Sequence, residues 1–180
     1  MSLNDKTTYE TASPAIEATP KDRRIAVLAI SALVILLDRI TKHIVAVQLP
    51  NGQAHTVIPG IVRSSDVHNT GAAFSMFAEN ASPVTVRNVL IAFSVVAVIV
   101  LLGMLWRVGR EISVTSVALA LILGGALGNL YDRALYHYVI DFLEVHIASY
   151  HWPDFNVADS CIVIGACLLL IEIFRPQPKS

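Results

Sequence analysis

The segment "GGALGNLYDR", Gly124 to Arg133, places small and polar residues at helical spacing at the end of a long apolar run. Gly124 and Gly128 form a small-xxx-small pair, which allows helices to approach closely in a membrane. Gly125 lies four positions before Asn129, and Asp132 and Arg133 lie three and four positions after it. These four residues are therefore predicted to share a second face of the same helix. Asn129 can donate a hydrogen bond to a neighbouring acid, whereas Asp132 and Arg133 suit either a site or a plain cap and anchor.

The composition around this segment is that of a membrane protein. Of 180 residues, 54% are apolar and 15% are charged, and the mean hydropathy is +0.61, well above soluble domains of this size. A helix needs about 20 mostly apolar residues to cross about 30 Å of hydrocarbon. Four segments meet or approach this length, so we expect a mainly α membrane protein with transmembrane helices at about 25–47, 88–106, 112–131 and 157–174.

Charge and cysteine usage exclude several classes of protein. A net charge of −1 leaves no basic stripe for nucleic acid, so no nucleic acid partner is expected. Cys161 and Cys167 lie on different faces of one apolar run, which indicates neither a disulfide nor a metal site. Residues 1–22 lack periodicity and an apolar signal core, and are predicted to be a disordered cytoplasmic tail. A second short tail, 176–180, leaves 23–175 as one transmembrane domain.

The basic residues predict the orientation of this domain. Three clusters precede the first span, link the second to the third, and follow the fourth: Lys21, Arg23, Arg24; Arg107, Arg110; Arg175, Lys179. The connections on the other side, about 48–87 and 132–156, carry only Arg63, Arg87 and Arg133. The positive-inside rule therefore places both termini in the cytoplasm and both long loops outside.

The two outer loops differ in sequence character. "HTVIPGIVRSSDVHNTGAAF", residues 55–74, has Val- and Ile-rich pieces broken by Pro and Gly, which predicts short strands and turns. "YVIDFLEVHI", residues 138–147, is also strand-like. Aromatic residues gather around the second loop, as in an interfacial belt, so we expect that loop to lie on the membrane surface.

Ionisable residues within a span are costly and need a reason. Lys42 lies four positions after Asp38, which is the spacing of an ion pair on one face of a helix. Such a pair would either fix helix packing or contribute directly to catalysis, and packing is the interpretation that the spacing favours. At 1.5 Å per residue, Asp38 is expected in the outer half of the membrane.

Asp159 lies in "FNVADS", residues 155–160, where the fourth span begins. The spacing alone favours a helix cap, because an Asp at a helix start accepts backbone N–H bonds. Asp141 precedes it by 18 residues on the same side of the membrane, within reach of a chain that folds back. Two carboxylates about 3 Å apart share one proton near neutral pH, a state suited to hydrolysis, so a catalytic pair is the second interpretation.

Other chemistries fit less well. The six histidines form no H-E-x-x-H pattern, and the nearest metal-like set, Glu144, His146 and His151, is expected on a surface loop. A proton-coupled transporter would distribute acids through the membrane, whereas these gather in the outer half. A non-catalytic scaffold would tolerate Asn at Asp141 and Asp159. A presenilin-type protease would need G-x-G-D, which is absent.

Five motifs occur in order along the chain: "DRITK", "HNTGAAFS", "GGALGNLYDR", "VIDF" and "FNVADS". Together they resemble the lipoprotein signal peptidases, also called signal peptidase II, from about residue 24 to 174. The resemblance implies an aspartyl endopeptidase of the bacterial inner membrane, with its active site near the periplasmic face. It also implies a small extracytoplasmic sheet beside the four helices, and a surface loop or helix over the site.

Carried over by motif, the resemblance makes Asp141 and Asp159 the catalytic pair, and Asp132 a structural partner of Arg133. Residues that bind substrate or support the site would be Asp38, Lys42, Asn69, Gly125, Asn129, Arg133, Asn156 and Ala158. The substrate would be a prolipoprotein cut before a diacylglyceryl-modified cysteine. Membrane lipids are the other expected partners, no metal or organic cofactor is implied, and a monomer is expected.

Overall fold

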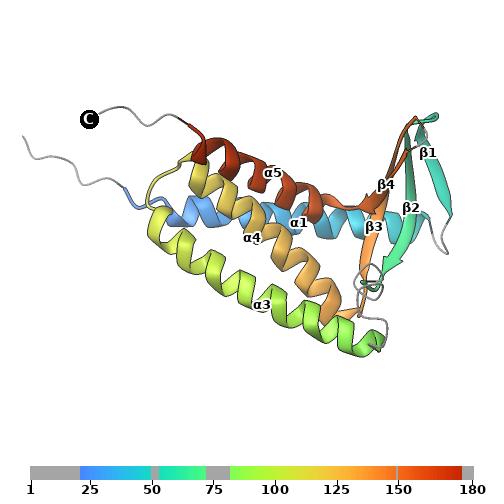
Figure 1. The fold of residues 1–180 in the computed structure, drawn as a ribbon, viewed down its shortest axis with the longest axis horizontal. Coiled ribbons are helices and arrows are strands. Elements are labelled where there is room, and N and C mark those ends of the chain that lie inside the picture. The colour runs from blue at the N-terminus through green and yellow to red at the C-terminus, as the bar shows by residue number, and fades with distance from the viewer. Residues whose placement is uncertain (1–20, 50–52, 72–81, 149, 176–180) are drawn as a thin grey trace, which may run out of the picture.

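The computed structural model describes residues 21–49, 53–71, 82–148 and 150–175. The predicted N-terminal tail lies outside these residues except for Lys21 and Asp22, and the tail at 176–180 lies wholly outside them. Four long helices run along one axis, with a small sheet at one end (Figure 1). The start of the first helix and the end of the last lie at the end away from the sheet (Figure 1).

The four helices are α1 (Arg24–Gln48), α3 (Pro83–Val108), α4 (Val114–Leu135) and α5 (Val157–Ile173). Each predicted span coincides with one of them. α3 begins earlier than expected because the Ser82 side chain accepts a hydrogen bond from the Thr85 N–H and Pro83 follows the cap. Among the described residues, α3 and α4 are long and apolar enough to cross a membrane; α1 carries Asp38, Arg39 and Lys42, and α5 has 17 residues.

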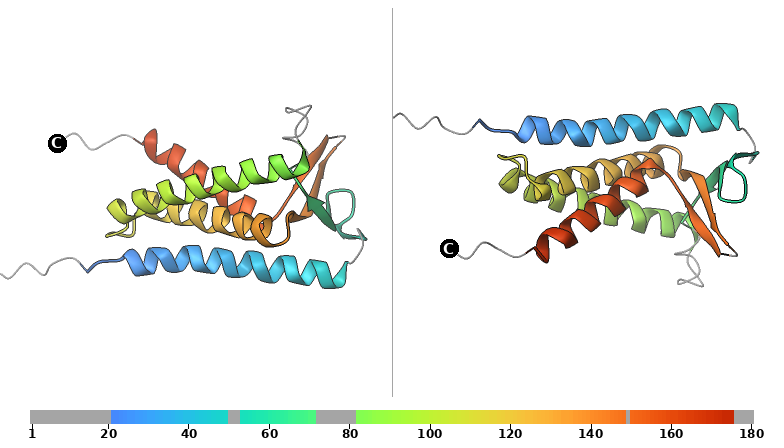
Figure 2. Two further views of the ribbon diagram at one scale, coloured as in Figure 1. Left: turned by 90° about the horizontal axis from the view of Figure 1, so that it is seen from below. Right: turned by 90° about the horizontal axis from the view of Figure 1, so that it is seen from above.

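α4 is the central helix and packs against α1, α3 and α5, with α5 inclined to it (Figure 2). The glycines of the segment 124–133 explain why α4 packs so closely against its neighbours. A Cβ on Gly124 would lie 2.7 Å from Val34 Cβ of α1, so any larger residue would push α1 away. A Cβ on Gly125 would meet the Ala158 carbonyl of α5. The predicted close approach is therefore confirmed, and it involves two neighbours on two faces.

An apolar core joins three of the helices and includes Val27 of α1, Leu105 of α3, and Leu119 and Leu123 of α4. Large apolar side chains also cover the outward faces of the helices, such as Phe93 of α3 and Ile173 of α5, exposed by 72% and 73%. Core burial holds the helices together, and the exposed apolar faces match a lipid surrounding better than water.

The sheet has four antiparallel strands in the order β1 (Ala54–Ile58), β2 (Val62–Asn69), β3 (Val139–Ile147) and β4 (Tyr150–Phe155). The strands predicted in the first outer loop are confirmed. Strand β3 pairs with β2 so that Asp141 faces Val67 and Val139 faces Asn69. This register brings the "HNTGAAFS" and "VIDF" motifs together, although about 70 residues separate them in the sequence.

The second outer loop, 132–156, contains the strand predicted over residues 138–147, which is confirmed as β3; its place on the membrane surface stays a prediction. Its residues form the last turn of α4 and the hairpin β3–β4, because the alternating segment 139–147 finds β2 as a partner on one edge and β4 on the other. The surface loop or helix expected over the site stays a prediction. Residues 72–81, in the first outer loop, are outside the described ranges.

Candidate active site

Polar side chains are buried together where α1, α4 and the start of α5 meet strand β3. All are less than 9% exposed, and they come from four elements: Asp38, Lys42, Asn129, Asp132, Asp141 and Asn156. Buried polar groups of this kind need hydrogen-bond partners. The partners divide the site into an ion cluster and a pair of acids held by amides.

The ion cluster consists of Asp38, Arg39, Lys42 and Asp132. Lys42 Nζ donates to Asp38 Oδ2 at 2.8 Å and to Asp132 Oδ2 at 2.7 Å, and Arg39 also pairs with both carboxylates. The ion pair predicted from the i,i+4 spacing is therefore confirmed. Two cations balance two anions, which is what permits such deep burial.

The ion cluster orients Asn129. Lys42 Nζ lies 3.2 Å from Asn129 Oδ1, and because an ammonium group can only donate, the carbonyl oxygen of the amide must face it. The amide nitrogen of Asn129 is then directed to Asp159 Oδ1, at 2.7 Å. A buried lysine on α1 thus sets the hydrogen bond that Asp159 receives.

Asn156 and Asp159 form a capping box at the start of α5. The Asp159 N–H donates to Asn156 Oδ1 at 2.9 Å, and the Asn156 N–H donates to Asp159 Oδ2 at 3.2 Å. Asn156 is the N-cap residue, so the capping interpretation of Asp159 is partly right: it closes the box from the third position. Asn156 Nδ2, on the other side of the amide, donates to Asp141 Oδ1 at 2.7 Å.

Asp141 accepts a second hydrogen bond from a side-chain amide: Asn69 Nδ2 donates to Asp141 Oδ2 at 2.8 Å. The Gly71 N–H donates to Asn69 Oδ1 at 2.8 Å, which fixes the direction of that amide in turn. Gly71 has φ of +88°, a conformation that favours glycine. The glycine of "HNTGAAFS" is therefore needed for the turn that aims Asn69.

The environment of Asp141 favours its protonated form. Burial raises the pKa of Asp141 to about 6, and the negative charge of Asp159 adds to the rise. Hydrogen bonds from Asn69 and Asn156 and the charge of Lys42 oppose it. Asp141 therefore changes charge close to neutral pH, as a proton-transfer group must.

The structure brings together the residues named from the sequence. Ala158 donates its N–H to Asp38 Oδ1 at 3.1 Å, which ties α5 to α1. Gly125 contacts the same turn of α5. The Arg133 guanidinium donates to the Asn129 carbonyl at 3.4 Å, and its charge interacts with Asp159 and Asp141.

One expectation is wrong. Asp132 was assigned to Arg133, but its ion pairs are with Lys42 and Arg39 of α1. The reason is helix geometry, because consecutive residues point about 100° apart and Asp132 faces α1. Two residues of the site were also missed. Arg39 follows Asp38 directly, and its signal in the sequence was its place within a motif. Gly128 was identified as a packing residue, but a Cβ on it would lie 2.9 Å from Asp38 Oδ2, so it also makes room for the ion cluster.

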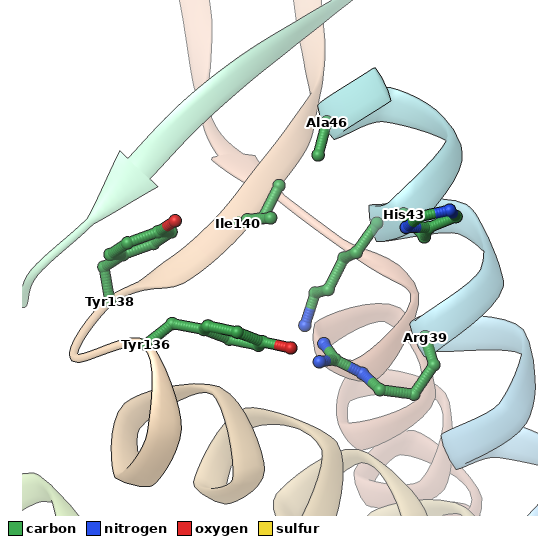
Figure 3. Close-up of a pocket in the computed structure, with 7 residues that line it drawn as sticks. Arg39, His43, Ala46, Tyr136, Tyr138 and Ile140 are labelled. Atoms are coloured by element: carbon green, nitrogen blue, oxygen red, sulfur yellow. The ribbon is translucent and has the colours of Figure 1, made fainter. Parts of the chain in front are cut away.

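Two cavities adjoin the site. One of about 320 Å³ is lined by Asp159 and Ser160 with the apolar side chains of Trp152, Phe155, Val163 and Ile164. The other, of about 280 Å³, lies between α1 and the start of β3, and its lining includes Arg39, Lys42, Tyr136 and Tyr138 (Figure 3). The Tyr136 hydroxyl is directed toward the Arg39 guanidinium (Figure 3). Only the first cavity reaches one of the two acids.

Comparison with known proteins gives a consistent result. The family model described as signal peptidase (SPase) II matches residues 30–175. The lipoprotein signal peptidase of Solibacter usitatus is 40% identical over 88% of this chain and 96% of its own length. The lipoprotein signal peptidase of Alteromonas mediterranea is 46% identical over 84% of this chain and 82% of its own length. A solved structure described as a bacterial membrane enzyme is 28% identical, with a TM-score of 0.77, and covers 89% of this chain and 100% of its own.

Proposed function

The chain belongs to the signal peptidase II family and removes signal peptides from prolipoproteins, and we propose that it does so as an aspartyl endopeptidase. Asp141 and Asp159 are the proposed catalytic pair. The proposed cleavage site is the bond before a diacylglyceryl-modified cysteine. The observation that carries the proposal is that both acids accept hydrogen bonds from neutral side-chain amides and that Asp159 lines an apolar cavity.

In the proposed reaction, one acid is ionised and the other protonated. The carboxylate takes a proton from water as the water oxygen attacks the scissile carbonyl carbon, and the protonated acid gives its proton to the carbonyl oxygen. Collapse of the tetrahedral diol breaks the C–N bond, and a proton passes to the departing amine. One water is consumed, the pair returns to its one-proton state, and no cofactor is needed.

The remaining residues act as positioning groups in this proposal. Asn156 and Asn69 direct the carboxylate of Asp141, and Asn129, itself oriented by Lys42, directs that of Asp159. Arg133 supplies positive charge near both acids. The apolar cavity beside Asp159 suits the side chains of an apolar signal peptide.

We also propose four membrane spans with cytoplasmic termini and the sheet on the outer face. Support comes from the clustering of basic residues at the end of the bundle away from the sheet. The Arg23 N–H donates to the Arg110 carbonyl, and Arg24 Nε donates to the Trp106 carbonyl, so the start of α1 and the link between α3 and α4 lie together. The catalytic pair would then act at the outer, periplasmic side of the inner membrane, in a monomer surrounded by lipid.

Substitution of each acid tests the proposal. Asp141→Asn and Asp159→Asn should each lower cleavage of a diacylglyceryl prolipoprotein by at least about a thousandfold in reconstituted membranes, a loss of about 4 kcal/mol in transition-state stabilisation. Asp66→Asn, in strand β2 of the same sheet, is the matched control and should cleave normally. Equal thermal midpoints would show that the variants are folded, and normal product from either Asn variant would overturn the assignment.

A further inference from the structure

A second cluster of ionisable residues lies on the β3–β4 hairpin, away from the helix bundle (Figure 1). Its members are Glu144 and His146 of β3, and His151 and Asp154 of β4. Glu144 and His146 lie within the predicted strand at 138–147, and His151 lies on the strand that pairs with it. His146 and His151 are directly opposite each other in the ladder, which fixes their spacing.

Three of the possible ligand atoms lie close together, one each from Glu144, His146 and His151. His146 Nε2 is 2.9 Å from Glu144 Oε1, and His151 Nε2 is 3.1 Å from the same oxygen. The two imidazole rings are stacked with centroids 4.8 Å apart. One ligand atom from each of Glu144, His146 and His151 lies within 4.8 Å of the others.

Asp154 supplies a fourth group and the clearest anomaly. Its Oδ1 is buried and has no hydrogen-bond partner among the described residues, although it lies 3.7 Å from His151 Nε2. Glu144 Oε1 and Asp154 Oδ1 both lie near His151 Nε2, at 3.1 and 3.7 Å. A buried acceptor without a donor, next to a second carboxylate, is costly unless a cation lies between them.

We propose that Glu144, His146, His151 and Asp154 bind one zinc ion. Zinc favours tetrahedral sites of imidazole nitrogens and carboxylate oxygens with bonds of about 2.0–2.2 Å, and that geometry places neighbouring ligand atoms about 3.3–3.6 Å apart. The distances of 2.9, 3.1 and 3.7 Å are close to this spacing. Calcium and magnesium prefer oxygen ligands, and none of the four residues is a thiolate that would favour a softer metal.

The proposed role is structural, separate from the peptidase reaction. β4 ends at Phe155, and Asn156 then caps α5 and donates to Asp141. An ion that joins β3 to β4 would hold this strand, and with it the start of α5. One cation already competes for Glu144: Arg63 Nη1 lies 3.7 Å from its Oε1, but this side chain is 46% exposed and can move into solvent.

Zinc binding by the full-length protein in detergent, purified without a histidine tag, tests the proposal. Elemental analysis after equilibration with micromolar Zn²⁺ and dialysis should give about one zinc per chain. Bound Co²⁺ should show the visible absorption of a tetrahedral site. Zinc should raise the thermal midpoint of the wild-type protein by stabilising the folded state.

Variants separate this site from adventitious binding. His146→Ala and His151→Ala should each weaken zinc binding at least tenfold and remove the zinc-dependent rise in midpoint, whereas the exposed His55→Ala in β1 should behave as wild type. Asp154→Asn is the conservative variant, should the histidine variants misfold, and should also weaken binding. Absence of stoichiometric zinc, or unchanged binding in His151→Ala and Asp154→Asn, would overturn the proposal. Either result would leave the Asp141 and Asp159 assignment unaffected.

Discussion

The ion cluster and Asp141 of the catalytic pair both place aspartates out of contact with water, but the hydrogen-bond partners of these aspartates differ. Asp38 and Asp132 are 0% and 1% exposed and are matched by Lys42 and Arg39. Asp141 is 3% exposed and receives its hydrogen bonds from the amides of Asn69 and Asn156. Equal burial therefore produces two chemical environments.

The partners decide what each aspartate can do. A carboxylate paired with a cation is fixed in a hydrogen-bonded ion pair, which suits a structural link between helices. A carboxylate held only by neutral amides keeps its position in either protonation state, so it can gain and lose a proton without moving. The ion cluster builds the site, and the pair of acids is left free to react.

The largest effect should come from breaking the ion cluster. Lys42→Met removes one of the two cations that Asp38 and Asp132 share and leaves one buried negative charge unbalanced, so it should destabilise the fold by about 3–5 kcal/mol. It also releases Asn129 from its fixed orientation, so activity should fall in the protein that remains folded. Thermal denaturation in detergent measures the first effect. Arg107→Met, at the exposed end of α3, is the control; equal midpoints for the two variants would contradict a structural role for the cluster.

A smaller effect should follow from removing an amide donor while keeping the helix cap. Asn156→Ser retains a side chain that can cap α5, so the contribution of the cap to stability should change by less than about 1 kcal/mol. The hydrogen bond to Asp141 is lost, and such a bond to a charged group contributes about 1.5–3 kcal/mol. Activity should therefore fall about 10- to 100-fold. A variant that loses stability and activity in parallel would show that capping alone explains Asn156.

The smallest effect should be a shift in pH dependence. The wild-type profile of log(kcat/KM) should have a limb near pH 6, from the raised pKa of Asp141. The Asn69 hydrogen bond lowers this pKa, so Asn69→Ala should raise it and move that limb to higher pH. The exposed Asn88→Ala is the matched control. A limb that stays in place would mean that the measured ionisation belongs to another group.

Several parts of the site follow from local spacing. The i,i+4 rule predicted the Asp38–Lys42 pair, and the i,i+3 spacing of Asn156 and Asp159 matches the capping box. The glycines of α4 predicted close helix packing. The partner of Asp132 was predicted wrongly, since a residue adjacent in sequence points in another direction on a helix.

The sequence by itself determined the apolar segments, the positions of the polar residues along them, and the motifs shared with a peptidase family, because these depend on composition and local periodicity. Only the tertiary structure decided which partner each aspartate receives. Asp141 meets Asn69 through the β2–β3 register and meets Asn156 through the hairpin that leads into α5. These contacts join residues far apart in the chain, so the spacing of residues in the sequence cannot predict them. They form because α1, α4 and α5 pack against the sheet.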